Sequence, residues 1–461
     1  MFSSVQCKPL LMLLCSALII FSYGSREGSA SELPHFITES YPSQLAETTY
    51  LINSELKPDL VKMRIKANFV TSDYQSFSTT VCMPSTAKCI ASYDLDQVAA
   101  VFKKNGWSMM PMLSHDSQLT KINKRDITNY IRFVSWFLDR YKAQANIQYI
   151  ELLNDPNKFW PGTDKQLLSL TNQTYDTVKS KHPSIKVGTA GMEYWADTQE
   201  KGWARTRYML DPSNGLKFDF WAFHAYPLAE MSNQRRRFIS LPPTRTPVEN
   251  QWAGNTGIVL LRKQFNDNGW QDRAIIDTEH VFVTPGREND FRDRLGAAYM
   301  VQDFAIKTGL KLEGNPAIQG VSGLKLIKRG MRAEMAWGSL SPNGSATERV
   351  KSVGLFWQKV KGMQHKERIS GEFDQEDTLW IEKYAKDNGD ELYVYFKPFE
   401  YHQGRNITFD NVTLTHALRL PKTPKEIIHT SLYGATQSKP VSNQVLLSGT
   451  NEPQFIEIKY R

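Results

Sequence analysis

The feature that most constrains the fold is a regular alternation of short apolar runs with longer segments of helical period, between residue 61 and about residue 330. Short apolar runs are typical of strands buried on both faces, and apolar residues three and four apart are typical of helices packed on a sheet. The alternation therefore predicts repeated β-α units around a parallel sheet. Strand-like runs occupy 61–70, 108–113, 147–153, 185–190, 218–226, 273–279 and 317–327, and helical stretches occupy 95–105, 127–143, 164–181, 256–268 and 289–309.

Seven strand candidates favour a closed (β/α)8 TIM barrel over an open doubly wound sheet if the poorly patterned stretch 71–94 supplies the eighth strand. After a helical segment at 351–362, strand-length runs separated by turns predict an antiparallel β-sandwich, and residues 33–60 are expected to join it or to cover the base of the barrel. The expected organisation is a leader at 1–30, a barrel at 31–363 and a β-sandwich at 364–461. The C-terminal runs are 377–384, 391–397, 406–414, 425–432, 443–448 and 454–460.

The N-terminus has the pattern of a signal peptide. An apolar run at 10–23 follows Lys8 and precedes Gly28-Ser29-Ala30, the small-residue pattern that a signal peptidase prefers. The run is shorter than the roughly 18–20 apolar residues that cross a bilayer, so export is favoured over an N-terminal anchor. We expect a secreted, periplasmic or extracellular protein without stable membrane insertion.

Cysteine content and charge exclude several classes of function. Removal of the leader leaves Cys82 and Cys89, which are close enough in sequence for one disulfide and too few for a metal site of cysteines. The net charge of +8 is modest and scattered, so it indicates ordinary solvated faces more than a polyanion site, apart from the run 235–237 of three arginines. Nucleic acid is not an expected partner, and no cofactor is expected, because no glycine-rich phosphate-binding fingerprint follows a strand.

Polar residues close three of the otherwise apolar strands. Asp155 follows Asn154 at the end of one strand, His224 lies at the end of another, and Glu279 ends a third. In a parallel barrel the carboxyl ends of strands converge on one open face, so Asp155 and Glu279 are expected to face each other across the mouth. Two carboxyl groups flanking a cleft are what glycoside hydrolysis requires, although an acid of this kind taken singly is more often a helix cap or a salt-bridge partner.

The segment 150–157, which includes Asn154-Asp155-Pro156, resembles the strand-4 signature Asn-Glu-Pro of the retaining (β/α)8 glycosidases of clan A. His224-x-Tyr226 and Thr278-Glu279 fall in the order of that clan, and the resemblance spans about residues 40–360 and points to glycoside hydrolase family 39. It implies an oligo- or polysaccharide substrate. It also implies Glu279 as nucleophile, Asp155 as acid/base, Asn154 on the sugar 2-hydroxyl, Tyr226 as a hydrogen-bond donor to the nucleophile, His224 in the sugar subsite, and Trp160 and Trp195 as stacking surfaces or core residues.

The sequence departs from the clan at the acid/base, where Asp155 is one methylene shorter than the usual Glu, and at Leu153, which replaces a common Trp. Three interpretations stay open: Asp155 works in place of Glu, another acid such as Glu193 substitutes for it, or the barrel binds sugar without cutting it. If Arg235 and Arg236 border the cleft, they would favour an acidic polysaccharide such as an exopolysaccharide. An exposed arginine loop without a partner is the alternative.

Overall fold

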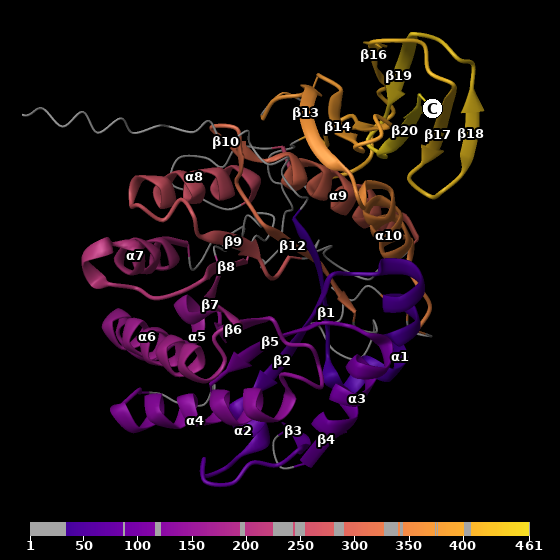
Figure 1. Cartoon of the computed structure of the whole chain (residues 1–461). Helices are drawn as coiled ribbons and strands as arrows, with labels where there is room; N and C mark the ends of the chain where they lie inside the picture. Colours follow the sequence, from indigo (N-terminus) through magenta and orange to yellow (C-terminus); the bar gives the residue numbers. More distant parts are fainter. Residues whose placement is uncertain are drawn as a thin grey trace, which may run out of the picture.

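The structure is a computed structural model in which a closed barrel carries a β domain on one flank (Figure 1). The part of the chain that it describes is 34–85, 88–115, 121–193, 199–224, 243–244, 254–280, 290–326, 340–341, 344–373, 375, 377–400 and 407–460. The predicted leader at 1–30 lies outside these residues. So do the side chains of Cys82 and Cys89, so the predicted disulfide stays a prediction.

Eight parallel strands close the barrel in the order β1-β12-β9-β8-β7-β6-β5-β2. Most of their residues are buried, since helices cover the outside of the barrel and side chains fill the inside; all six residues of β5, for example, are buried. The (β/α)8 fold expected from the sequence is confirmed. The strands are β1 (His35–Ser40), β2 (Leu60–Lys66), β5 (Met109–Ser114), β6 (Tyr149–Asn154), β7 (Lys186–Glu193), β8 (Phe220–His224), β9 (Ala274–Asp277) and β12 (Gly320–Leu326).

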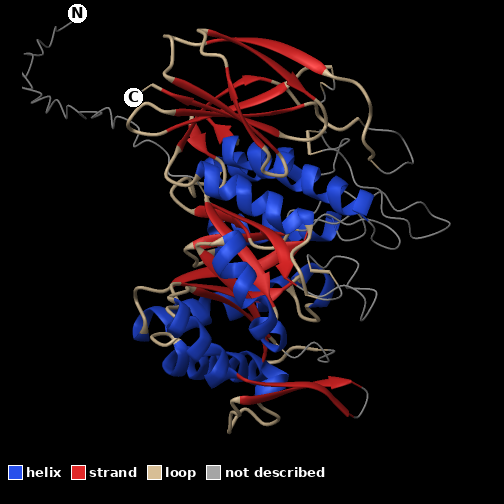
Figure 2. Cartoon of the chain, turned by 90° about the vertical axis from the view of Figure 1, so that its right-hand side faces the viewer, coloured by secondary structure: helices blue, strands red, loops and turns tan. Residues whose placement is uncertain are grey.

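The helices surround the barrel (Figure 2), and side-chain caps fix where three of them begin. Asp94 caps the helix at 95–105, and capping boxes at Asn123 and Thr163 start the helices at 124–141 and 164–181, because each side chain accepts from backbone N–H groups of the first turn. The predicted helices at 95–105 and 164–181 are confirmed to the residue. The α-helices are α1 (Leu45–Leu51), α2 (Ala67–Val70), α3 (Leu95–Asn105), α4 (Lys124–Tyr141), α5 (Pro156–Phe159), α6 (Asp164–Lys181), α7 (Gln199–Leu210), α8 (Gly254–Asp267), α9 (Asp290–Gly309) and α10 (Glu348–Val360).

The eighth barrel strand is β1, and the expectation that 71–94 supplies it is wrong. Residues 71–94 instead contain the antiparallel hairpin of β3 (Thr80–Ser85) and β4 (Lys88–Asp94), which pair only with each other. The expectation that 33–60 joins the C-terminal domain or covers the base is wrong for residues 35–40, because these residues form the barrel strand β1. Strand β1 escaped notice because its buried residues include Thr38, Glu39 and Ser40, each at most 1% exposed, so that it lacks an apolar run.

The C-terminal domain is an antiparallel β-sandwich, as the sequence predicted. A six-stranded sheet, β13-β14-β15-β20-β17-β18, is accompanied by the pair β16-β19. A hydrophobic cluster joins the two layers, with Ile381, Tyr393 and Ile458 from the larger sheet and Leu418 and Leu447 from the pair. The strand expected at 406–414 begins only at Leu414. The bounds are β13 (Gln364–Ser370), β14 (Trp380–Ala385), β15 (Glu391–Phe396), β16 (Leu414–Arg419), β17 (Glu426–Ser431), β18 (Thr436–Lys439), β19 (Gln444–Gly449) and β20 (Gln454–Lys459).

Helix α9 carries polar contacts between the two parts of the molecule. The side-chain amide of Gln302 donates to the carbonyl oxygens of Lys397 (3.2 Å) and Asn451 (2.7 Å), and the hydroxyls of Thr308 and Tyr384 share a hydrogen bond of 2.6 Å. These groups are buried, so each contact satisfies polar atoms that would otherwise lose water without compensation. The β domain is therefore seated on the α9 side of the barrel (Figures 1 and 2).

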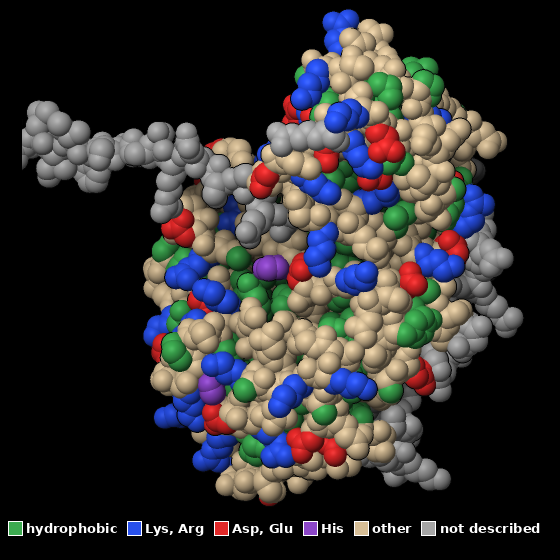
Figure 3. All heavy atoms as spheres, turned by 45° about the vertical axis from the view of Figure 1, so that its right-hand side comes forward, with side chains coloured by type: hydrophobic (Ala, Val, Ile, Leu, Met, Phe, Trp, Pro, Cys, Tyr) green, Lys and Arg blue, Asp and Glu red, His purple; other side chains and the backbone are tan. Residues whose placement is uncertain are grey.

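On the face shown in Figure 3, basic and acidic side chains are interspersed and form no single-sign patch. This distribution fits the interpretation of the positive charge as ordinary solvated surface. Within the described ranges, no helix is both long enough and apolar enough to span a bilayer.

A substitution at Gly354 tests how tightly α10 packs against the helical turn at 52–56. A Cβ atom at this position would lie 2.2 Å from the backbone oxygen of Glu55. Although Ala favours a helix over Gly, we expect Gly354→Ala to lower the free energy of unfolding by about 1–3 kcal/mol, because backbone must move to relieve the overlap. Urea unfolding against Lys351→Ala, on the exposed side of the same helix, measures the effect. A Gly354→Ala protein as stable as the wild type would contradict this packing.

Candidate active site

The carboxyl ends of four consecutive barrel strands bring together polar side chains that are largely buried. Asn154 and Asp155 end β6, Glu193 ends β7, His224 ends β8, and Glu279 follows β9. Asp155, Glu193, His224 and Glu279 are each at most 8% exposed. The structure thus gathers the predicted residues Asp155, His224 and Glu279 at the mouth of the barrel, with Glu193 among them.

The backbone at the end of β6 adopts an uncommon conformation. Leu153 and Asp155 have φ angles of 57° and 42°, in the left-handed region that residues other than glycine rarely enter. The amide of Asn154 donates to the carboxylate of Asp155 directly beside it. Backbone strain of this kind persists only where surrounding contacts enforce it, and it is concentrated at functional sites.

His224 joins Asp155 to a second carboxylate, Glu151, inside the barrel. Its Nδ1 lies 2.6 Å from Asp155 Oδ1, and its Nε2 lies 3.2 Å from Glu151 Oε1. Burial alone would lower the pKa of His224, but the charges of Asp155 and Glu279 and the hydrogen bonds to Asp155 and Glu151 raise it to about 10. At neutral pH the ring is therefore an imidazolium that donates from both nitrogens. Gly191 leaves room for it, since a Cβ there would lie 2.2 Å from Nε2.

Lys62 continues this chain of charges across the barrel. Its Nζ lies 3.0 Å from Glu151 Oε2 and 3.8 Å from Glu279 Oε2, and it donates to the backbone oxygen of Thr278 at 2.9 Å. Burial alone would raise the pKa of Glu151, but Lys62 and His224 more than offset it and lower the pKa. Lys62 and Glu151 are completely buried, so each ion depends on the other for compensation.

Glu279 is oriented by an arginine. Arg64 Nη2 lies 3.0 Å from Glu279 Oε2 and 3.8 Å from Glu39 Oε1. With Lys62 also nearby, two cations favour the ionised carboxylate of Glu279, which is the form that attacks as a nucleophile.

In contrast to Glu279, Glu193 lies in an environment that disfavours a negative charge. It is 3% exposed, and the Nζ of its ion-pair partner Lys158 lies 3.8 Å from its Oε2. Burial and then the negative charge of Asp155 raise the pKa of Glu193 from 4.5 to about 7, with a smaller contribution from Glu279 and opposition from Lys158 and His224. Asn157 fixes the end of β7, because its amide donates to the backbone oxygen of Glu193.

The remaining predicted site residues are placed differently. Trp160 is 4% exposed in the hydrophobic core, where its indole N–H donates to the backbone oxygen of Thr163 at 3.0 Å and its ring meets the edge of His115. This placement corresponds to the core alternative for Trp160. Tyr226, Trp195, Arg235 and Arg236 lie outside the described residues, and their roles stay predictions.

The sequence did not single out Lys62, Arg64 or Glu151. The available signal was a charged residue at every second position of an apolar run, Lys62 and Arg64 in β2, which places both on one face of the strand. Among the described residues, no group of three or more His, Cys, Asp or Glu side chains could hold a metal ion.

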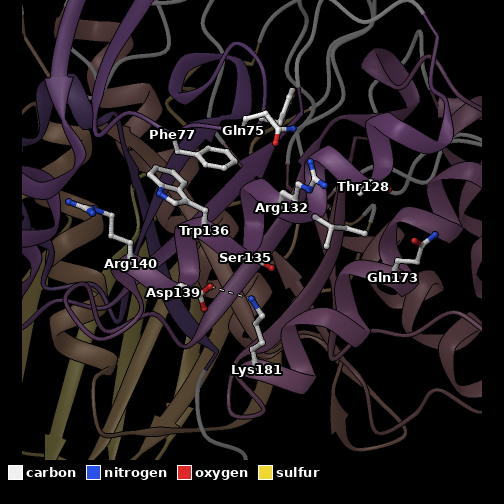
Figure 4. A pocket seen from close by; sticks show the side chains of 12 residues that line it. Gln75, Phe77, Thr128, Arg132, Ser135, Trp136, Asp139, Arg140, Gln173 and Lys181 are labelled. Atoms are coloured by element: carbon white, nitrogen blue, oxygen red, sulfur yellow. Dashed lines mark hydrogen bonds and ion pairs between the residues drawn. The ribbon is translucent and has the colours of Figure 1, made fainter.

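A groove of about 840 Å³ lies outside the barrel, between the segment after α2 and the outer faces of α4 and α6 (Figure 4). Its one carboxylate, Asp139, forms an ion pair of 3.3 Å with Lys181, and Arg140 pairs with Asp96 at 2.5 Å. A single neutralised carboxylate cannot supply the two groups that glycoside hydrolysis needs. The mouth of the barrel is therefore the candidate active site.

No protein-family profile matches the chain, and no curated protein matches it. Among solved structures, a family 39 glycoside hydrolase from Bacteroides cellulosilyticus WH2 has 14% identity, a TM-score of 0.66, and coverage of 93% of this chain and 81% of that one. A monomeric β-xylosidase from Caulobacter crescentus CB15 has 14% identity, a TM-score of 0.61, and coverage of 93% and 98%. A family 44 xyloglucanase from Paenibacillus polymyxa has 10% identity, a TM-score of 0.56, and coverage of 94% and 97%. The glycosidase-like barrel with its β domain is thus confirmed as a fold.

The pair formed by Lys62 and Glu151 can be tested by a double-mutant cycle. Lys62→Met leaves Glu151 buried without its lysine, so we expect it to lower the free energy of unfolding by about 3–5 kcal/mol. The double variant Lys62→Met/Glu151→Gln should recover part of this loss because the stranded charge is gone. Urea unfolding of the wild type, both single variants and the double variant gives the coupling. Additive effects of the two substitutions would contradict the pairing.

The raised pKa of Glu193 predicts a pH-dependent gain in stability on substitution. Glu193 stabilises the fold below its unfolded pKa of about 4.5, and this contribution is lost as the pH rises through about 7. Glu193→Gln should therefore gain on the order of 2 kcal/mol relative to the wild type between pH 5 and pH 8. Urea unfolding at both pH values measures this, with the exposed Glu372→Gln as matched control. A difference that does not change with pH would contradict the assigned environment.

Proposed function

We propose that the protein is a glycoside hydrolase that cleaves O-glycosidic bonds of a polysaccharide. The observation that carries the proposal is the Glu279 carboxylate, held by Arg64 at 3.0 Å in the mouth of the barrel, with the carboxyl groups of Asp155 and Glu193 on neighbouring strand ends. Hydrolysis of a glycoside needs one carboxylate at the anomeric carbon and a second carboxyl group at the leaving oxygen. The likeness in fold to glycoside hydrolases is consistent with this assignment.

In this mechanism Glu279 is the nucleophile. Its ionised carboxylate attacks the anomeric carbon while the second carboxyl group protonates the leaving oxygen, and a covalent glycosyl-enzyme forms. Water then attacks from the side that the leaving group vacated, so the product keeps the anomeric configuration of the substrate. Asn154 is proposed to bind the sugar 2-hydroxyl, and His224 to line the subsite.

The proposed setting is outside the cytoplasm, because the N-terminal residues have the pattern of a signal peptide. The proposed substrate class is a polysaccharide, including an acidic exopolysaccharide if Arg235 and Arg236 border the cleft. The structural neighbours include proteins described as a xylosidase and a xyloglucanase, which makes neutral plant-type glycans a second class to test.

A second candidate function is sugar binding without catalysis. The observation that favours it is the environment of Asp155, whose two carboxylate oxygens are both engaged as hydrogen-bond acceptors, one by Asn154 and the other by His224. The two functions differ in one respect: an enzyme consumes glycan, and a binding protein only retains it.

Release of reducing sugar from acidic and neutral polysaccharides tests the proposed function. We expect the wild type without residues 1–30 to release sugar, and Glu279→Gln to lose activity about 10³-fold or more, which corresponds to about 4 kcal/mol of transition-state stabilisation. Retention of glycan by Glu279→Gln in affinity electrophoresis is the control for folding. Binding by both proteins with release by neither would contradict the hydrolase and support the binding protein.

A further inference from the structure

We propose that Glu193, at the end of β7, is the group that protonates the leaving oxygen, and that Asp155 is a positioning residue. This inference rests on the proposed glycosidase function. It follows from the hydrogen bonds and ion pairs of the two carboxyl groups, which are opposite in kind.

Both carboxylate oxygens of Asp155 accept hydrogen bonds. Oδ1 receives a hydrogen bond of 2.6 Å from His224 Nδ1, and Oδ2 receives one from the amide of Asn154. Because His224 also donates to Glu151 on its other side, the ring holds Asp155 as the anionic partner of an imidazolium. Both oxygens of Asp155 are therefore engaged with protein donors.

Glu193 has the opposite arrangement. Its Oε2 is buried, and no group within the described residues forms a hydrogen bond with it. The charged groups that act on it come from four elements: Asp155 after β6, Lys158 in α5, His224 in β8 and Glu279 after β9. Lys158, the ion-pair partner of Glu193 within the described part of the chain, is 3.8 Å away and about half exposed, so it compensates a buried negative charge only weakly.

The raised pKa of Glu193 agrees with this geometry. The pKa of Glu193, raised to about 7 by burial and by the charge of Asp155, keeps a large fraction of the side chain protonated near neutral pH. A carboxyl group whose pKa is raised toward neutral pH is the kind of group that donates a proton in general acid catalysis. Asp155 therefore assists catalysis through its charge, by keeping the proton on Glu193.

The proposed reaction has two steps, with Glu193 as proton donor in the first and proton acceptor in the second. A Glu279 oxygen forms a bond to the anomeric carbon, and the bond from that carbon to the leaving oxygen breaks with its electron pair on the oxygen. The leaving oxygen takes the proton of Glu193, which becomes a carboxylate. In the second step this carboxylate takes a proton from water, whose oxygen bonds to the anomeric carbon and releases Glu279. Glu193 and Glu279 belong to strands that are separated by β8 alone, whereas two strands lie between those of Asp155 and Glu279.

Substrates that differ in leaving group distinguish the two acids. The leaving group of a 2,4-dinitrophenyl glycoside departs with almost no protonation, whereas the leaving oxygen of a glycan must be protonated. With polysaccharides and with 2,4-dinitrophenyl β-D-xyloside and β-D-glucoside as probes, we expect Glu193→Gln to lose about 10²–10⁴-fold in kcat/KM on glycan and less than about tenfold on the aryl glycoside. Asp155→Asn should lower both to a similar extent. The proposal would be overturned if Glu193→Gln lowered kcat/KM on both substrates to a similar extent while Asp155→Asn lowered it mainly on glycan.

The pH profile gives a readout that a purely structural role would not change. For the wild type on glycan, kcat/KM should fall as the pH rises through about 7. Removing the nearby cation in Lys158→Met should move this limb to higher pH by a few tenths of a pH unit, and removing the nearby anion in Asp155→Asn should move it to lower pH. A limb that responds to neither substitution would overturn the proposal.

Infrared spectroscopy tests the protonation without substrate. The carbonyl band of a protonated carboxyl group, present at pH 6 and lost by pH 8, should be absent in Glu193→Gln and present in the exposed control Glu372→Gln. Its disappearance in Asp155→Asn with persistence in Glu193→Gln would contradict the assignment. Failure of the wild type on every glycan and aryl glycoside would contradict the proposed function itself, whereas glycan cleavage that survives in Glu193→Gln would contradict only the role of Glu193.

Discussion

The structure of the site depends on one chain of buried ion pairs, which runs from Lys62 through Glu151 and His224 to Asp155. Removing a charge from water costs several kcal/mol, and only a close partner of opposite sign offsets that cost. Each member is therefore fixed by its neighbours, and Gly191 is required because any larger residue would meet both His224 and Glu151. The interior of the barrel is thus an ordered electrostatic support for the residues at its mouth.

This support explains how a shorter acid can occupy the end of β6. Asp155 lies 2.6 Å from the imidazolium of His224, and its negative charge raises the pKa of the neighbouring Glu193. Glu279 meanwhile lies beside Arg64 and Lys62, which favour its ionised form. The mouth therefore contains one ionised carboxylate held by cations and one carboxyl group that tends to keep its proton, which is the combination that glycoside hydrolysis uses.

The sequence predicted those features that depend on local pattern. Alternating apolar runs placed seven barrel strands, and polar residues at the strand ends located Asp155, His224 and Glu279. Strand β1 was missed because its buried polar residues Thr38, Glu39 and Ser40 interrupt the apolar pattern. The charge chain was missed because a charged residue within a strand does not reveal its partner across the barrel: Lys62 and Glu151 are far apart in sequence. Glu193 could only be named as an alternative, since its raised pKa arises from burial and from Asp155 on another strand.

If Glu279 attacks the anomeric carbon, the glycosyl-enzyme that forms can be trapped on its side chain. An activated 2-deoxy-2-fluoro glycoside forms the covalent intermediate but slows its hydrolysis, so that the labelled residue can be identified by peptide mass mapping. We expect a single sugar adduct on the peptide that contains Glu279, and none in Glu279→Gln. A stable adduct on Asp155 or Glu193, or turnover with inversion of the anomeric centre and no adduct, would contradict it.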